Sequence, residues 1–340
     1  MHIKVLGAAA GGGFPQWNCG CPNCWEVRAG TLAAKPLTQE CVAVSADDEC
    51  WFLLNASPEI RSQIESFSPL HPRGPRHSPI SAIVLTNGDL DHILGLLSLR
   101  ESHPLVIYAT ECVRKGFTEN NVLYRTLQRF PGQVTWKTLA LGQDVELQGA
   151  DNKASGLFVV AVPVPGKPPV HLEGLAPDDP GENIGLLIVD SKTSGRLAYF
   201  SAAGGLTPVM RAAMDSAGCV FFDGTFWSSD ELITLGLGTK RAEEMAHLPL
   251  GGPGGSLDAL KDIRTPRRIY IHINNTNPLL RPDSPERAEA EANGWEVAHD
   301  GMEITLSAIR CVHRCHKMSS STGCATKAKA VTTTHIVTIR

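Results

Sequence analysis

Residues 85–92 have the sequence LTNGDLDH, and this segment is the most informative about the fold. It follows an apolar run, residues 82–85, that has the composition of a buried strand, and residues 92–100 read as the start of a helix. In an extended loop, the alternate positions Asn87, Asp89 and Asp91 could point the same way, and with His92 they would suit a divalent metal. The segment alone leaves an equal alternative, a solvated turn in which an aspartate caps the helix.

Apolar runs of strand length recur on both sides of this segment. The expected strands are 3–6, 41–44, 51–54, 82–85 and 105–108 in the first half, and 157–162, 184–189, 197–200, 219–222, 268–273 and 301–306 in the second. The first expected helix starts at Ser57-Pro58, with Ser57 as N-cap and Pro58 at the first helical position, and its apolar residues are Ile60, Ile64 and Phe67. The other expected helices are 208–215, 255–261 and 285–292. Strands followed by helices in both halves predict an α/β fold, an αββα sandwich of two packed sheets with helices outside.

The chain of 340 residues, 42% of them hydrophobic, can bury one large core. We assign residues 1–306 to a single domain and read residues 163–182, rich in Pro, Gly and acids, as a surface loop. Residues 307–340 contain no Asp or Glu and carry runs of Ser and Thr. This composition is typical of a disordered tail, and a frameshifted or read-through end is the alternative.

Charge and targeting signals exclude several classes of protein. The net charge of −4 and the sequence pI near 6.3 give no electrostatic case for nucleic acid or an anionic membrane. The sequence starts with a strand-like run instead of a signal peptide, and no apolar run reaches the roughly 20 residues of a membrane span. We therefore expect a cytoplasmic protein whose ten cysteines are mostly reduced.

Three of these cysteines, Cys19, Cys21 and Cys24, lie within six residues. Cys-x-Cys-x-x-Cys lets a tight turn bring three sulfurs to one ion, and zinc prefers such ligands, so we predict a structural Zn²⁺ site with a fourth ligand from elsewhere. Three ordinary thiols in a loop are the alternative. The preceding glycines, residues 11–13, lack the spacing of a phosphate-binding loop and are expected to form a tight turn.

Further candidate ligands lie at other predicted strand ends. Asp223 follows the apolar run 219–222, and His272 lies inside the strand-like run 268–273. A lone histidine in a strand is usually a core residue, but several strand ends that each offer a ligand are typical of an active site. His247 is a weaker candidate that would support the ligands instead of binding metal.

Residues 87–92, NGDLDH, resemble the His-x-His-x-Asp-His motif of the metallo-β-lactamase superfamily, and the cysteine motif resembles the zinc motif of its phosphodiesterase-like branch. The most specific resemblance is to the pyrroloquinoline quinone (PQQ) biosynthesis protein B family. It rests on residues 11–19 (GGGFPQWNC), 55–58 (NASP), 223–225 (DGT) and 271–278 (IHINNTNP). The resemblance covers residues 1 to about 306.

The sequence departs from the superfamily pattern at its metal ligands. Asn87 and Asp89 stand where the superfamily has two metal-binding histidines. The superfamily's middle histidine would fall near residues 201–204, which contain no histidine. The resemblance leaves Asp91, His92 and His272, with Asp223 as a further candidate, and two histidines with one carboxylate suit Fe²⁺. At the cysteine site, Asn275 occupies the position of the branch's fourth ligand, a histidine.

The resemblance implies a role in making PQQ, a redox cofactor built from a Glu and a Tyr of a small peptide. We expect an iron-dependent oxygenase that hydroxylates the tyrosine ring of the precursor, with metal ligands Asp91, His92 and His272. Asp89 or Asp223 would add a ligand or handle protons.

The alternative is a carrier that transports PQQ or its precursor to the periplasm, which would need only a pocket and the zinc. Hydrolysis by two zincs is disfavoured by the missing histidines. The sequence leaves the oligomeric state open, with a homodimer as one option.

Overall fold

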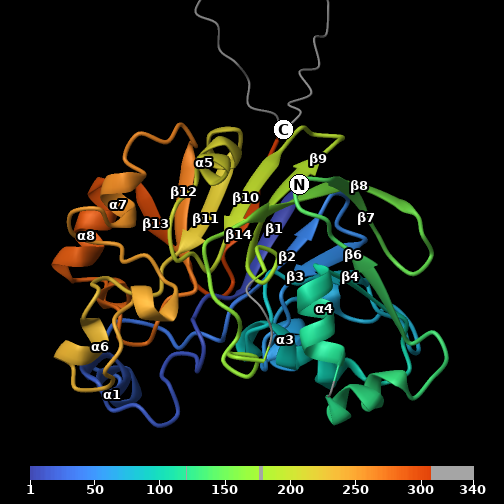
Figure 1. Ribbon diagram of the computed structural model, residues 1–340, viewed down its shortest axis with the longest axis horizontal. Coiled ribbons are helices and arrows are strands. Elements are labelled where there is room, and N and C mark those ends of the chain that lie inside the picture. Colours follow the sequence, from blue (N-terminus) through green and yellow to red (C-terminus); the bar gives the residue numbers. More distant parts are fainter. Residues whose placement is uncertain (120, 176–178, 308–340) are drawn as a thin grey trace, which may run out of the picture. The chain divides into compact units, whose positions relative to one another are not determined.

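Two β-sheets pack face to face in the computed structural model, which describes residues 1–119, 121–175 and 179–307 (Figure 1). Within these residues each sheet has seven strands, in the orders β14-β1-β2-β3-β4-β5-β6 and β13-β12-β11-β10-β9-β8-β7. The αββα sandwich expected from the sequence is confirmed.

The first sheet contains β1 (His2–Gly7), β2 (Cys41–Ser45), β3 (Trp51–Leu54), β4 (Ile80–Val84), β5 (Leu105–Ala109), β6 (Val134–Thr138) and β14 (Glu303–Thr305). The second contains β7 (Asp144–Gln148), β8 (Ala154–Pro163), β9 (Ile184–Asp190), β10 (Arg196–Phe200), β11 (Cys219–Asp223), β12 (Arg267–Ile271) and β13 (Trp295–Val297). Strands β3 to β6 run parallel, as do β10 to β13. The carboxyl ends of parallel strands share one edge of a sheet, so β4, β11 and β12 can each deliver side chains to a common site.

Helices cover the outer faces of the two sheets. The helices are α1 (Pro22–Ala29), α2 (Ile60–Glu65), α3 (Leu90–Ile93), α4 (Glu111–Thr118), α5 (Pro208–Asp215), α6 (Glu231–Thr234), α7 (Ser256–Ala259) and α8 (Pro285–Ala292). Strand β2 shows how the layers form: Val42 and Val44 face the core between the sheets, whereas Cys41 and Ala43 face the core under α2 and α4. This alternation buries both faces of the strand, which explains its continuous apolar sequence.

Several expectations about elements need correction. Helix α2 begins at Ile60, with Glu59 as the preceding residue, so Ser57 is not its N-cap; the Ser57 hydroxyl instead donates to Gln63 Oε1 at 2.8 Å. Pro58 likewise lies before the helix. Strand β12 ends at Ile271, so His272 lies just outside it, in the left-handed region at φ 59°. The sequence analysis also missed β6, β7, β13, α1 and α4, which are short or strongly polar.

Strand β14 ends the described domain beside β1, close to the expected boundary at residue 306. The proposed tail lies outside the described residues except for Ser307. Among the helices of the described ranges, none is long and apolar enough to cross a lipid bilayer.

Candidate metal centre

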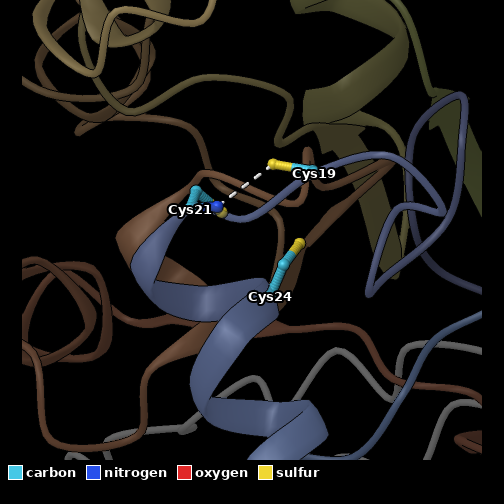
Figure 2. Close-up of side chains that lie close together, drawn as sticks. All are labelled: Cys19, Cys21 and Cys24. Atoms are coloured by element: carbon cyan, nitrogen blue, oxygen red, sulfur yellow. Dashed lines mark hydrogen bonds between the residues drawn. The ribbon is translucent and has the colours of Figure 1, made fainter.

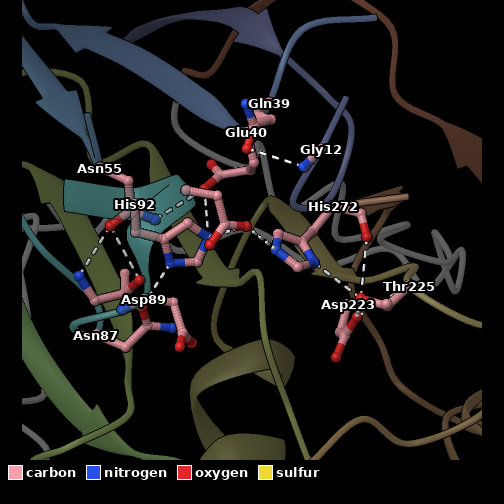
Figure 3. Close-up of polar contacts among 12 residues, drawn as sticks. Gly12, Gln39, Glu40, Asn55, Asn87, Asp89, His92, Asp223, Thr225 and His272 are labelled. Atoms are coloured by element: carbon pink, nitrogen blue, oxygen red, sulfur yellow. Dashed lines mark hydrogen bonds and ion pairs between the residues drawn. The ribbon is translucent and has the colours of Figure 1, made fainter. Parts of the chain in front are cut away.

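Asp91, His92 and His272 meet at the edge where the carboxyl ends of the parallel strands lie. Figure 3 shows the side chains of His92 and His272 at this site. Asp91 and His92 come from the four-residue helix α3, which follows β4, and His272 follows β12. One candidate ligand atom from each residue lies within 4.8 Å of the others. His272 Nε2 is 3.1 Å from Asp91 Oδ2, and His92 Nε2 is 3.9 Å from the same oxygen. The structure thus brings together the three residues expected to bind the active-site metal.

Asn87 fixes the orientation of His92. Asn87 Oδ1 accepts the backbone N–H of Asp89 at 3.0 Å, so this atom is an acceptor, and it lies 2.7 Å from His92 Nδ1. The ring must therefore carry its proton on Nδ1 and present the lone pair of Nε2 toward Asp91. Asn87 does not point the same way as Asp91, contrary to the expectation for alternate positions. It supports the far side of the histidine ring instead.

Thr225 and Asp223 fix His272 in the same manner. The Thr225 hydroxyl donates to Asp223 Oδ1 at 2.5 Å, so it must accept from His272 Nδ1, which lies 2.8 Å away. His272 Nε2 is thereby left facing Asp91, where it donates a hydrogen bond while the ring is charged and could bind a metal once that proton is lost. The left-handed backbone of His272 is uncommon for a histidine and is typical of residues held at functional sites.

The charges of the cluster shift its pKa values. Burial disfavours the ionised form of Asp91, but the charges of His92 and His272 outweigh burial and hold its pKa well below the usual range. Burial also opposes the charged form of His272, yet the hydrogen bond to Asp91 and the charges of Asp91, Asp223 and Glu40 raise its pKa to about 9. Burial lowers the pKa of His92 to about 4. His92 is therefore a neutral ligand at pH 7, and His272 carries a positive charge that a bound metal could replace.

Asp223 and His247 form a second group behind His272. Asp223 is fully buried and accepts from Ala203 N and, through Oδ2, lies 2.7 Å from His247 Nδ1. The rings of His247 and His272 stack with centroids 5.6 Å apart. Asp223 thus reaches the first cluster through Thr225 and His272, which suits a positioning residue better than a ligand shared with Asp91.

Asp89 is not part of any of the three residue groups that could hold a metal among the described residues. It immediately precedes α3, and burial together with the charge of Asp91 raises its pKa to about 6. A carboxyl group that titrates near neutral pH beside the cluster is suited to accepting or releasing a proton.

The sequence analysis missed Glu40, which is completely buried beside His92. Its Oε2 lies 3.4 Å from His92 Nε2 and accepts from Asn55 Nδ2 at 2.8 Å, while burial raises the pKa of its carboxyl to about 8. No local pattern marks Glu40, because it precedes an ordinary strand. The sequence signal was indirect: Asn55, whose side chain contacts Glu40, belongs to the NASP motif at residues 55–58. In the structure Asn55 has a positive φ of 63°.

Cys19, Cys21 and Cys24 lie where a loop enters α1, and Figure 2 shows their side chains gathered there. The three sulfurs lie within 4.8 Å of one another. The arrangement differs from the expected tight turn only in that Cys24 belongs to the first turn of the helix. Burial raises the pKa of Cys21 to about 12, so binding a metal there must displace protons.

Asn275 faces all three sulfurs. Its Nδ2 donates to Cys19, Cys24 and Cys21 Sγ at 3.1, 3.2 and 3.6 Å. Donor atoms of a tetrahedral zinc site with thiolates lie roughly 3.5–3.8 Å apart, so the end of Asn275 stands near a fourth corner. A rotation of the amide by 180° would bring its oxygen to this place.

Both residue groups fit a metal. At the first, the Nε2 atoms of two buried imidazoles face a carboxylate, and a cation could replace the proton that His272 shares with Asp91. At the second, three sulfurs converge with a side chain at the remaining corner.

The chain resembles proteins of one metal-associated superfamily along most of its length. Residues 50–273 match the family model described as "Beta-lactamase superfamily domain". Coenzyme PQQ synthesis protein B of Azotobacter vinelandii is 44% identical over 307 residues, 90% of this chain and all of that protein. The corresponding protein of Pseudomonas entomophila is 42% identical over the same shares.

Solved structures agree with this relationship. The crystal structure of Zn²⁺-bound PqqB from Methylobacterium extorquens is 43% identical, has a TM-score of 0.83, and is matched over 90% of this chain and 100% of that one. A diphosphatase of the PhnP family, 20% identical with a TM-score of 0.61 over 90% of this chain and 98% of that one, shares the fold. The chain therefore belongs to the coenzyme PQQ synthesis protein B family of the β-lactamase superfamily.

Proposed function

We propose that this protein is a non-haem iron oxygenase that hydroxylates the tyrosine ring of the PQQ precursor. The observation that carries the proposal is the convergence of Asp91, His92 and His272 with both Nε2 atoms turned toward the carboxylate. Two histidines and one carboxylate leave coordination positions open, as oxygen chemistry requires. A protein that only carried PQQ would have no need for such a set.

Bound iron would supply the activation of dioxygen, and the polypeptide supplies geometry and proton handling. Asn87 and Thr225 hold the two imidazoles in the tautomer that binds metal. Asp223 fixes Thr225, and His247 holds Asp223 from the other side. Asp89, with a pKa of about 6, can take up the proton that the ring carbon loses when it is hydroxylated.

The cysteine site is proposed to hold a structural Zn²⁺, with Asn275 as the fourth ligand. Support comes from the distances of Asn275 to the three sulfurs and from a relative, 43% identical, that was crystallised with Zn²⁺. Several sulfur ligands leave little Lewis acidity, so this zinc would stabilise the junction of the loop with α1.

The test is anaerobic loading with Fe²⁺, followed by oxygen, ascorbate as reductant and a peptide-derived Glu–Tyr precursor, with mass spectrometry of the product. Wild type is expected to add one or two oxygen atoms to the precursor. His92→Ala should abolish the gain because it removes a ligand, whereas His103→Ala, at a histidine outside the cluster, should retain it.

The outcomes separate the candidate functions. Loss of the oxygen gain in His92→Ala alone would support the oxygenase. A protein that keeps zinc at its cysteines but binds no iron at Asp91, His92 and His272 would contradict the oxygenase and leave the carrier, which could then be tested by binding of PQQ itself.

A further inference from the structure

Glu40 is a buried carboxylate that the proposed three-ligand centre does not use. It lies between β1 and β2, and its backbone N–H donates to Ala9 O at 2.8 Å. Its side chain is completely buried, and its Oε1 has no hydrogen-bond partner among the described residues. A buried carboxylate oxygen without a partner is costly, so its environment requires an explanation.

Asn55 aims this carboxylate. Asn55 Oδ1 accepts from Thr86 N at 2.9 Å and from its hydroxyl at 3.0 Å, so the amide orientation is fixed and Nδ2 must donate to Glu40 Oε2. Asn55 takes up a left-handed backbone at φ 63° to make these contacts. Asn55 thus positions the Glu40 carboxyl group, and Thr86 positions Asn55.

Glu40 Oε2 lies 3.4 Å from His92 Nε2, the ring nitrogen whose lone pair is free (Figure 3). Because His92 Nδ1 donates its proton to Asn87 Oδ1, the Nε2 lone pair faces the Glu40 carboxyl group, and His92 Nε2 has no hydrogen-bond partner among the described residues. His272 Nε2 lies 3.1 Å from Asp91 Oδ2, and the proton that it shares with this oxygen occupies a place that a cation could take. A cation placed among these four atoms would satisfy all of them.

The distances agree with one shared ion. Adjacent ligand atoms about 2.1 Å from an octahedral metal lie roughly 3 Å apart. The contacts of 3.1 and 3.4 Å are close to this value, and the 3.9 Å between His92 and Asp91 is within the span of a single coordination sphere. Glu40 lies outside the group whose ligand atoms are all within 4.8 Å of one another, so its carboxylate would move toward the ion on binding.

We propose that Glu40 is a fourth protein ligand of the centre formed by Asp91, His92 and His272, completing a set of two histidines and two carboxylates. The proposal rests on the metal centre of the proposed function but not on its oxygen chemistry. Two carboxylates neutralise a divalent ion inside a buried site, and the additional oxygen ligand favours Mn²⁺ or Fe²⁺ over softer metals. Of six octahedral positions, two remain for exogenous ligands.

The protein is first stripped of metal, and its cysteine site is then filled with zinc. Binding of Mn²⁺ to this protein is measured by the electron paramagnetic resonance of the ion. Glu40→Gln keeps the shape of the side chain and is expected to weaken Mn²⁺ binding at least 30-fold. Glu59→Gln is the matched control: Glu59 is a half-buried carboxylate nearby that accepts from Gln39 Nε2 at 2.9 Å and does not contact the cluster. It should bind Mn²⁺ within twofold of wild type.

Two further measurements separate a ligand from a residue that only supports the fold. The absorption of bound Co²⁺ should change in Glu40→Gln because the ion loses an oxygen ligand, and formate should restore affinity to Glu40→Ala by filling the vacated position. Wild-type Mn²⁺ affinity in a folded Glu40→Gln, or no response of Glu40→Ala to formate, would overturn the proposal.

If Glu40→Gln does not fold, Glu40→Asp keeps the charge while withdrawing the oxygen from His92. It is expected to bind Mn²⁺ about tenfold more weakly, and wild-type affinity there would equally contradict the proposal. Dependence of Mn²⁺ binding on Glu40 would stand even if no oxygenated product formed, so failure of this inference and failure of the oxygenase remain distinguishable.

Discussion

Asn87 supports the candidate metal centre through His92 and is not one of its expected ligands. It stands where the superfamily has a histidine ligand, but its side chain accepts from Asp89 N and lies 2.7 Å from His92 Nδ1. Asn87 thus orients a neighbouring histidine that is one of the three residues of the candidate metal centre.

Asn87→Ala should weaken Mn²⁺ or Fe²⁺ binding by about 10- to 100-fold, the usual effect of removing a hydrogen-bond partner of a metal-binding histidine. Binding is measured by titration of the metal-free protein. Asn152→Ala, at an exposed loop position, is the control. Equal affinity in the two variants would mean that Asn87 does not orient His92.

Asn275 is the proposed fourth zinc ligand at the cysteines. At this position the phosphodiesterase-like branch of the superfamily has a histidine. Because imidazole nitrogen binds zinc more strongly than an amide oxygen, Asn275→His should slow the loss of zinc to a chelator, and Asn275→Ala should accelerate it. Zinc release is followed with a colorimetric chelator. Identical release from all three proteins would exclude position 275 as a zinc ligand.

At the scale of elements, the site depends on close approach of the loop after β1 to helix α3. A Cβ added at Gly11 would lie 3.3 Å from Asp91 Oδ2, closer than most such contacts. Gly12 N donates to Gln39 Oε1 at 3.0 Å, which links the same loop to the segment that carries Glu40. The glycines at 11–13 thus form a turn, as expected, and the turn borders the candidate metal centre.

Gly11→Ala should therefore displace Asp91 slightly and weaken Mn²⁺ binding roughly fivefold, because metal ligands tolerate only a few tenths of an ångström of misplacement. Gly74→Ala provides the control, since its added Cβ would have no neighbour within 4 Å. Thermal unfolding of both metal-free variants should match wild type. An unchanged Mn²⁺ affinity in Gly11→Ala would show that Asp91 can move without loss.

Across the whole molecule, a buried ion pair joins the start of the first strand to the end of β9 in the second sheet. The Met1 ammonium donates to Asp190 Oδ2 at 2.7 Å and to Leu306 O at 2.9 Å, with both charged groups fully buried. Asp190 ends β9, and Leu306 follows β14, so the pair connects both sheets of the sandwich. Such a pair contributes to stability mainly through the penalty for breaking it.

Asp190→Asn should lower the free energy of unfolding by roughly 3 kcal/mol at pH 7, because it leaves a buried ammonium without its counter-ion. Burial opposes ionisation of Asp190, but the Met1 ammonium and Thr193 outweigh it and lower its pKa. A carboxylate with a lowered pKa stabilises the fold above its unfolded pKa of about 3.9, and this stability is lost as the pH falls through the folded pKa.

The difference between wild type and Asp190→Asn should therefore narrow as the pH drops below about 4. Urea unfolding at several pH values measures it, with Asp151→Asn, at an exposed residue, as the control. A difference that stays constant down to the lowest pH would contradict the ion-pair explanation.

The sequence by itself determined the layered α/β class and the cysteine motif and, through its resemblance to a known superfamily, indicated that Asp91, His92 and His272 meet. Buried strands read as apolar runs, and closely spaced cysteines mark themselves, because these signals are local. The resemblance to the superfamily supplied the pairing of α3 with the end of β12, which no local pattern specifies.

Only the tertiary structure decided which polar residues support these ligands. Asn55 lies 15 residues from Glu40 and Thr225 lies 47 residues from His272, so their contacts depend on how strands pack together. Glu40 precedes an ordinary strand and carries no local mark, and the direction of Asn87 follows from the path of one loop. Side-chain orientation at a sheet edge is set by packing between segments that are distant in the sequence. A local sequence pattern does not contain this information.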